Sequence, residues 1–189
     1  MPEEAFTERD YYLSGQPGPG ARLSESFPRD QISTDLVASI ATGVMTSVAI
    51  LLSQGDIITN LSFLSGATPA SVPLHSWFAL YSSAATPALL QQTADQLTGA
   101  WAADTVITLA LAAPVVIATT GVYYASVMVV ATTVPTLMGK TTARASAAGA
   151  IVAGQVILAR TSGSALTTTA PATITGGATL ATMPYCVAT

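Results

Sequence analysis

Few residues of this chain could take part in acid–base or nucleophilic chemistry. His75 is the only histidine and Cys186 the only cysteine, so a Ser-His-Asp or Cys-His arrangement would have to use one of them. His75 follows a proline-containing stretch and begins an apolar run that includes Trp77. We therefore expect a structural or surface role for His75, and we expect Cys186 to be a small buried residue.

The acidic residues offer one further candidate site. Asp95 and Asp104 flank Trp101, an arrangement in which a sugar ring could stack on the indole and hydrogen-bond to the carboxylates. A glycosidase would need two carboxylates about 5–10 Å apart across a cleft. A structural role explains both aspartates more simply, because Asp95 falls in a predicted turn and Asp104 at the start of a predicted strand. Trp101 and Asp95 remain a candidate receptor contact.

No motif for a cofactor or metal is recognisable in the sequence. There is no phosphate loop, no dinucleotide fingerprint and no zinc-ligand spacing, and the GGATLA run at 176–181 is typical of a loop. We predict that the protein is not an enzyme, that it uses no cofactor and that it holds no metal.

Charge is scarce and unevenly placed. Half of the chain is apolar and 8% is charged, against about 25% in typical soluble proteins. Seven of the ten acidic residues and three of the six basic residues lie in residues 1–35, which therefore carry a net charge of −4. The remaining residues balance to zero and form no basic cluster, so we expect no nucleic-acid binding.

Residues 105–139 carry no charge, and residues 115–134 are apolar enough to be considered as a transmembrane segment. Pro114, Gly121 and Pro135 interrupt this stretch, and its residues are mainly Val, Thr, Ile, Tyr and Ala. β-Branched runs between turn residues are typical of strands. We predict strands and no membrane insertion, with a transmembrane segment as the alternative. The acidic start of the chain has no signal-peptide pattern, so we expect synthesis and assembly in the cytoplasm.

The first 35 residues are predicted to form an extended charged arm. The SGQPGPG run at 14–20 is incompatible with helix or strand. Apolar side chains recur in this polar stretch, which a free tail would seldom show. We predict an arm that lies in a groove of another subunit, with a tail that contacts nothing as the alternative. The proposed contact residues are Tyr11, Tyr12, Leu13, Leu23 and Phe27.

From residue 36 to 189 the pattern changes to short strands separated by turn residues. Alternation is clear at 75–81, where Trp77, Ala79 and Tyr81 share one face. We predict an all-β fold, an antiparallel β-sandwich and in particular a jelly roll. Residues 140–155 could be loop or short helix, and 163–179 are predicted to be a loop. The expected strands are 43–52, 57–63, 75–81, 89–93, 105–111, 114–118, 121–131, 156–160 and 183–187.

Several runs taken together resemble a known family. They are SFLSG at 62–66, HSWFALY at 75–81, LLQQTADQ at 89–96, AWAADTVITLAL at 100–111, TTGVYYASVMVVATTVPTL at 119–137, TTTAPATITGG at 167–177 and MPYCVAT at 183–189. In this order they resemble a β-sandwich domain of tailed actinobacteriophages that occurs in minor tail, tail-fibre and head-surface proteins of the virion. The resemblance covers roughly 44–189 and leaves the arm outside.

The resemblance implies a structural protein of the virion without catalytic residues. Its expected partners are other virion proteins, either major capsid or tail subunits, and copies of itself in a homo-oligomer. A small single domain behind a short arm favours a capsid decoration or head-surface protein. The alternative is a minor tail or tail-tip protein whose loops bind a glycan of the host surface.

Overall fold

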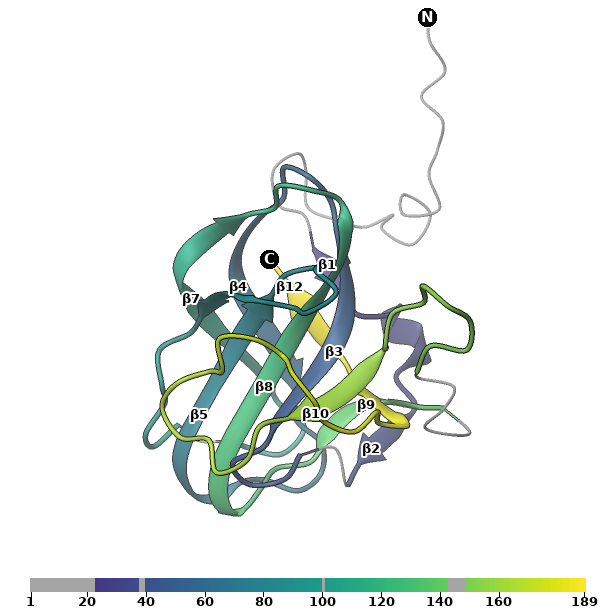
Figure 1. Cartoon of the computed structure of the whole chain (residues 1–189). Helices are drawn as coiled ribbons and strands as arrows, with labels where there is room; N and C mark the ends of the chain where they lie inside the picture. The colour runs from purple at the N-terminus through teal and green to yellow at the C-terminus, as the bar shows by residue number, and fades with distance from the viewer. Residues whose placement is uncertain (1–22, 38–39, 100, 143–148) are drawn as a thin grey trace, which may run out of the picture.

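A computed structural model describes residues 23–37, 40–99, 101–142 and 149–189. These residues form an all-β sandwich of antiparallel strands, which confirms the predicted fold class (Figure 1). The single helical element among them is the short 3-10 turn η1 (Arg29–Gln31). None of the helical structure in this described part is long and apolar enough to cross a membrane.

Two main sheets and one small sheet make up the fold. The four-stranded sheet has the order β1 (Ser24–Glu25), β12 (Cys186–Ala188), β4 (Ile57–Leu64) and β7 (Val106–Val116). The five-stranded sheet has the order β10 (Ala159–Ser162), β3 (Met45–Leu52), β8 (Gly121–Thr133), β5 (Ser71–Tyr81) and β6 (Leu89–Gln92). The three-stranded sheet has the order β11 (Thr182–Pro184), β9 (Leu137–Thr141) and β2 (Thr34–Leu36).

The connectivity is that of a jelly roll. Four antiparallel pairs are nested in the chain, with β5–β6 innermost, then β4–β7 and β3–β8, and β1–β12 outermost. When these eight strands are numbered in chain order, one sheet has the order 1-8-3-6 and the other 2-7-4-5. This is the arrangement produced when one long hairpin of paired strands is rolled into two sheets. The small sheet and β10 are additions to it.

The main core lies between the two large sheets. Phe78 and Leu80 of β5 point into it, together with Leu61 and Phe63 of β4, and all four side chains are at most 1% exposed. Alternation along β5 then places Trp77, Ala79 and Tyr81 on the opposite face, as predicted.

Most of that outer face of the five-stranded sheet is also buried. Its centre is a row of small residues, Ser47, Ser126 and Ala79, which are neighbours in register and have no exposed surface. Ala170 and Ile174 of residues 163–179, called here the covering loop, pack over this face. Burial on both faces explains why β3, β5 and β8 are almost continuously apolar, including the part of β8 that falls in the candidate transmembrane stretch.

Strand positions differ from the prediction at several places. The expected strand at 183–187 is two short strands, β11 and β12, in different sheets, and β9 was not expected. Residues 105–111 and 114–118 were expected as two strands, whereas β7 runs through both. Its pairing with β4 jumps from Val115 to Ala110, and Pro114 lies in the bulge between them. A bulge removes proline from the hydrogen-bonded ladder, so the strand continues past it.

Candidate functional site

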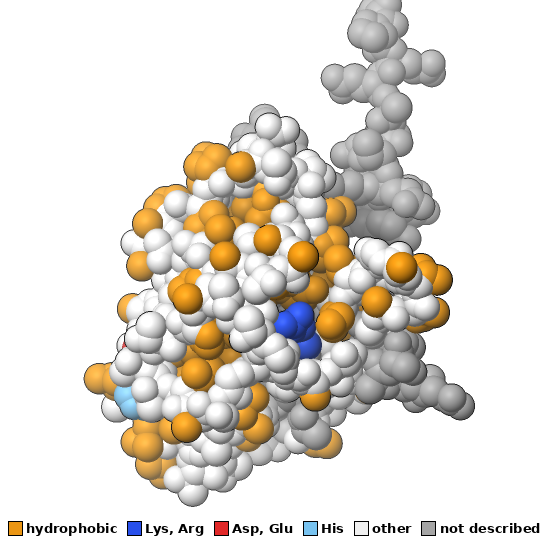
Figure 2. All heavy atoms as spheres, viewed as in Figure 1, with side chains coloured by type: hydrophobic (Ala, Val, Ile, Leu, Met, Phe, Trp, Pro, Cys, Tyr) orange, Lys and Arg blue, Asp and Glu red, His pale blue; other side chains and the backbone are white. Residues whose placement is uncertain are grey.

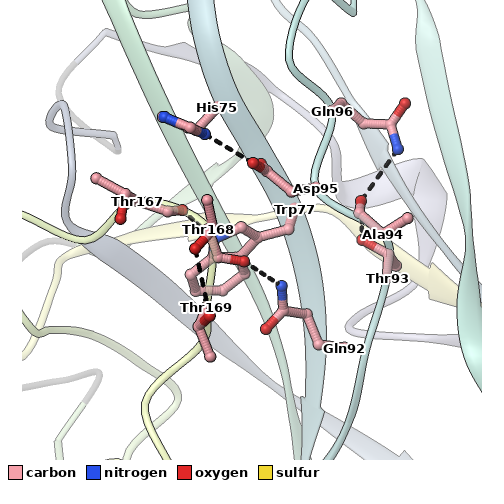
Figure 3. Close-up of polar contacts among 10 residues, drawn as sticks. All are labelled: His75, Trp77, Gln92, Thr93, Ala94, Asp95, Gln96, Thr167, Thr168 and Thr169. Carbon is pink, nitrogen blue, oxygen red and sulfur yellow. Dashed lines mark hydrogen bonds and ion pairs between the residues drawn. The ribbon is translucent and has the colours of Figure 1, made fainter.

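Among the described residues, His75 and Asp95 form the polar pair best suited to acid–base chemistry. His75 lies on β5 and Asp95 in the segment after β6, and Nδ1 of the imidazole is 2.7 Å from Oδ2 of the carboxylate. The side chains are 25% and 13% exposed, respectively. The second carboxylate oxygen, Oδ1 of Asp95, is buried without a hydrogen-bond partner. Figure 3 shows the pair beside the threonines of the covering loop.

The covering loop is fixed next to this pair by side chains from the outer sheet face. Nε1 of Trp77 donates to the carbonyl oxygen of Thr167 at 2.7 Å. The amide of Gln92 makes two hydrogen bonds to the covering loop. Its Nε2 donates to the Thr168 carbonyl at 2.8 Å (Figure 3), and its Oε1 accepts from the Ala170 N–H at 2.6 Å. The backbone is therefore tied down while the side chains of Thr167 and Thr168 stay exposed.

The pair resembles two thirds of a catalytic triad but lacks the third member. A triad would require a hydroxyl or thiol bonded to Nε2 of His75, and no hydrogen bond to that nitrogen is found among the described residues. The neighbouring hydroxyls of Thr168 and Thr169 lie 3.4 Å from each other instead. What the geometry does provide is a link between β5 and the segment that carries Asp95, which fits the structural role expected for His75.

Trp101 is not the exposed aromatic that the sequence predicted. It is 2% exposed, packs edge-on against Phe78 with ring centroids 5.8 Å apart, and donates from Nε1 to Ser76 Oγ at 3.3 Å. Ser76 and Phe78 face the main core, whereas His75 and its partner Asp95 lie on the outer side of β5. The candidate receptor contact formed by Trp101 and Asp95 is therefore wrong, because β5 separates the two side chains.

Residues 24–36 belong to the sandwich and not to an arm. Strand β1 pairs with β12 and β2 pairs with β9. Phe27 is 7% exposed in the main core, and its ring lies 5.6 Å from that of Tyr185. The boundary of the arm at residue 35 and the role of Phe27 as a partner contact are thus wrong. Residues 23–36 are called here the root.

Polar contacts hold the root on the sandwich. The hydroxyl of Tyr185 donates to Glu25 at 2.7 Å, and Lys140 Nζ lies 4.5 Å from the centre of the Phe27 ring while it donates to Gln31 Oε1. Burial, aided by Glu25, raises the pKa of Tyr185, and desolvation lowers the pKa of Lys140. Leu23 is half-buried at the start of the root. The other proposed arm contacts, Tyr11, Tyr12 and Leu13, lie outside the described residues.

Cys186 lies in β12 with no exposed surface, as expected for a small buried residue. Burial raises the pKa of its thiol, which keeps the sulfur protonated and unreactive. In the described part of the chain, no group of three His, Cys, Asp or Glu side chains is placed to hold a metal ion.

The upper part of the outer face, beyond the covering loop, is exposed and apolar. Leu51 of β3 is 54% exposed beside half-buried Val122 of β8, and Val156 and Leu158 are 40% and 36% exposed. Arg160 of β10 stands on the same face. We call these five residues the Arg160 face. In Figure 2 one patch of positive side chain lies over β10, with hydrophobic side chains on both sides of it.

Comparisons with known proteins add no identification. No family model matches this chain, and no curated protein matches it. The resemblance to a virion surface domain therefore stays a prediction.

Proposed function

We propose that the chain is a structural protein of a bacteriophage virion, specifically a capsid decoration or head-surface protein. In this proposal residues 1–22 attach it to the particle, and the jelly roll associates with copies of itself. The observation that carries the proposal is the contrast between the two parts. Residues 23–189, which include the root, hold six acidic and four basic residues, whereas residues 1–22 hold four acids and two bases in a much shorter stretch.

The fold supports this reading by analogy only. Jelly rolls occur in viral capsids, and also in lectins and cupins, so the topology does not select one function. The surface is more informative. An almost uncharged body has little electrostatic repulsion between copies, which suits a protein that packs at high local density in a symmetric assembly.

The root gives the attachment segment a rigid start. Because β1 is paired at the sheet edge and Phe27 is in the core, the chain leaves the sandwich from a fixed point next to Leu23. A tether with a fixed origin orients the domain on the surface to which it binds. The alternative, a tail protein that binds glycan, is not favoured, because the aromatic residue that motivated it is buried in the core.

The test is the copy number of the protein in purified particles, measured by quantitative peptide mass spectrometry. Hundreds of copies per particle support a capsid decoration protein. A few copies would place it in the tail and refute the head location, and absence from the particle would refute the whole proposal. A variant that lacks residues 1–22 should fold but fail to join the particle, and normal incorporation would refute the attachment role of that segment.

A further inference from the structure

Arg160 carries a charge that the described part of the protein does not neutralise. Its Nη2 donates to the carbonyl oxygens of Ile174 and Gly176 at 3.1 and 3.4 Å, and its Nε is buried without a partner. No carboxylate of the described residues lies within ion-pair distance of it. A half-buried guanidinium that has lost water and gained only carbonyl partners is a favourable place for an anionic group.

The neighbourhood of Arg160 is apolar and held in a defined shape. Ala49 N–H donates to the Leu158 carbonyl at 2.8 Å, and the hydroxyl of Tyr124 donates to the Ile157 carbonyl at 2.9 Å. Leu51, Val156 and Leu158 are exposed on the same face as the cation, so a ligand that covers this face would combine negative charge with apolar side chains.

The root begins on the same side of the sandwich as the Arg160 face. Strand β1 is the edge of the four-stranded sheet and contacts β3, while β10 is the edge of the five-stranded sheet next to β3. The two edges therefore lie on the same side of the sandwich (Figure 1). The ten residue-to-residue steps from 13 to 23 can span roughly 30 Å, whereas stacked sheets are only about 10 Å apart.

The composition of residues 3–13 matches the face. This stretch has four acids, Glu3, Glu4, Glu8 and Asp10, against the single base Arg9. It also has the apolar side chains Phe6, Tyr11, Tyr12 and Leu13.

We propose that residues 3–13 bind to the Arg160 face of their own chain. A carboxylate of the segment pairs with Arg160, and its aromatic side chains cover the aliphatic residues around it. This contact goes beyond the proposed function, since it concerns the free protein before it meets a partner. It withholds the segment, so that an attachment surface must compete for it.

The test is disulfide trapping in the isolated full-length chain. Cysteines are introduced as Tyr12→Cys and Val156→Cys, and the reference pair is Tyr12→Cys with Thr108→Cys on the opposite edge strand β7. Val156 and Thr108 are exposed, and Thr108→Cys gives up only the hydrogen bond to Ser62 Oγ, so both variants should fold. Cys186 is buried and does not compete. Under mild oxidation the first pair should form an intramolecular disulfide at least tenfold faster than the reference pair, and the product should be a monomer.

Charge variants test the ion pair. Glu8→Gln with Asp10→Asn should slow trapping at least threefold, and so should 1 M salt, where the Debye length is about 3 Å. These changes leave the sandwich untouched. Arg160→Gln should act in the same way, while Arg160→Lys should keep most of the rate. Equal rates for the two cysteine pairs, a dimeric product, or a rate indifferent to the acidic residues would overturn the proposal. None of these results depends on the copy number in particles, so the proposed function stands or falls separately.

Discussion

Replacing Phe27 by alanine tests whether the root belongs to the folded domain. The side chain is 7% exposed, and its ring contacts Tyr185 and the Lys140 ammonium. Truncation of a buried phenylalanine costs about 3–5 kcal/mol. We expect about 3–4 kcal/mol here, because the site lies near the sheet edge, where neighbours can partly close the gap.

The assay is equilibrium unfolding in urea followed by tyrosine and tryptophan fluorescence. With a slope of about 2 kcal/mol per molar, the loss corresponds to a midpoint lower by roughly 1.5–2 M. The matched control is Val37→Ala, at the end of the same segment, whose side chain is 80% exposed and whose truncation should leave the midpoint unchanged. Phe27→Leu should lie between the two, because it keeps apolar volume and loses the ring.

The reasoning fails if Phe27→Ala and Val37→Ala unfold at the same midpoint. That result would mean that residues 23–35 do not contribute to the stability of the sandwich and form a separate arm. A normal midpoint shift with a smaller slope would instead mean that the variant has lost the root but kept the remaining sandwich, since the slope scales with the surface exposed on unfolding.

Four further outcomes are expected. Gly139→Ala should lower the free energy of unfolding by about 2–3 kcal/mol, because the new Cβ would overlap a carbonyl oxygen of β11. In Gly154→Ala the new Cβ meets open space, so the loss should be only about 1 kcal/mol, caused by the positive φ. Equal unfolding midpoints for the two variants would contradict this. Cys186 should resist a thiol reagent at pH 8 in the folded protein and react fully in urea, and rapid native reaction would show that its burial is wrong. Burial raises the pKa of Tyr185 in the folded protein, so as pH rises the Tyr185 hydroxyl loses its proton in the unfolded chain first. The free energy of unfolding should therefore stay constant below pH 10 and fall above it. An unfolding midpoint that is constant from pH 9 to 11 would refute this. Trp77→Phe removes the hydrogen bond from the indole to the covering loop. If this bond contributes about 1.4 kcal/mol against local opening, subtilisin should cleave the loop roughly tenfold faster in the variant. Unchanged cleavage would show that other contacts hold the loop.

The fold class could be predicted because long strands carry a strong pattern. Alternation at Trp77, Ala79 and Tyr81 is visible in the sequence, and the structure places these residues on one face as expected. What the pattern could not show is that this face is buried. The covering loop has no periodicity, and its position depends on single bonds from side chains such as Gln92 to backbone groups far away in the chain.

The errors at Phe27 and Trp101 have related causes. Strand β1 has two residues and β2 has three, too short for any periodicity, and their pairing partners, β12 and β9, lie about 100 residues or more away in the chain. Trp101 stands among alanines, a glycine and aspartates, a context typical of exposed loops, yet its indole fills the core beside Phe78. Hydrophobic residues in irregular segments therefore need tertiary information to be placed.

The outermost pair of the jelly roll also constrains the order of events during synthesis. The N–H of Cys186 donates to the hydroxyl of Ser26 across 160 residues, so the root cannot close until β12 has been made. Closing so long a loop is slow compared with local pairing. A ribosome that stops early would release a chain whose β1 has no partner and whose N-terminal segment has no fixed origin. Pairing of the root with the sandwich therefore requires that β12, the partner of β1, has been synthesised.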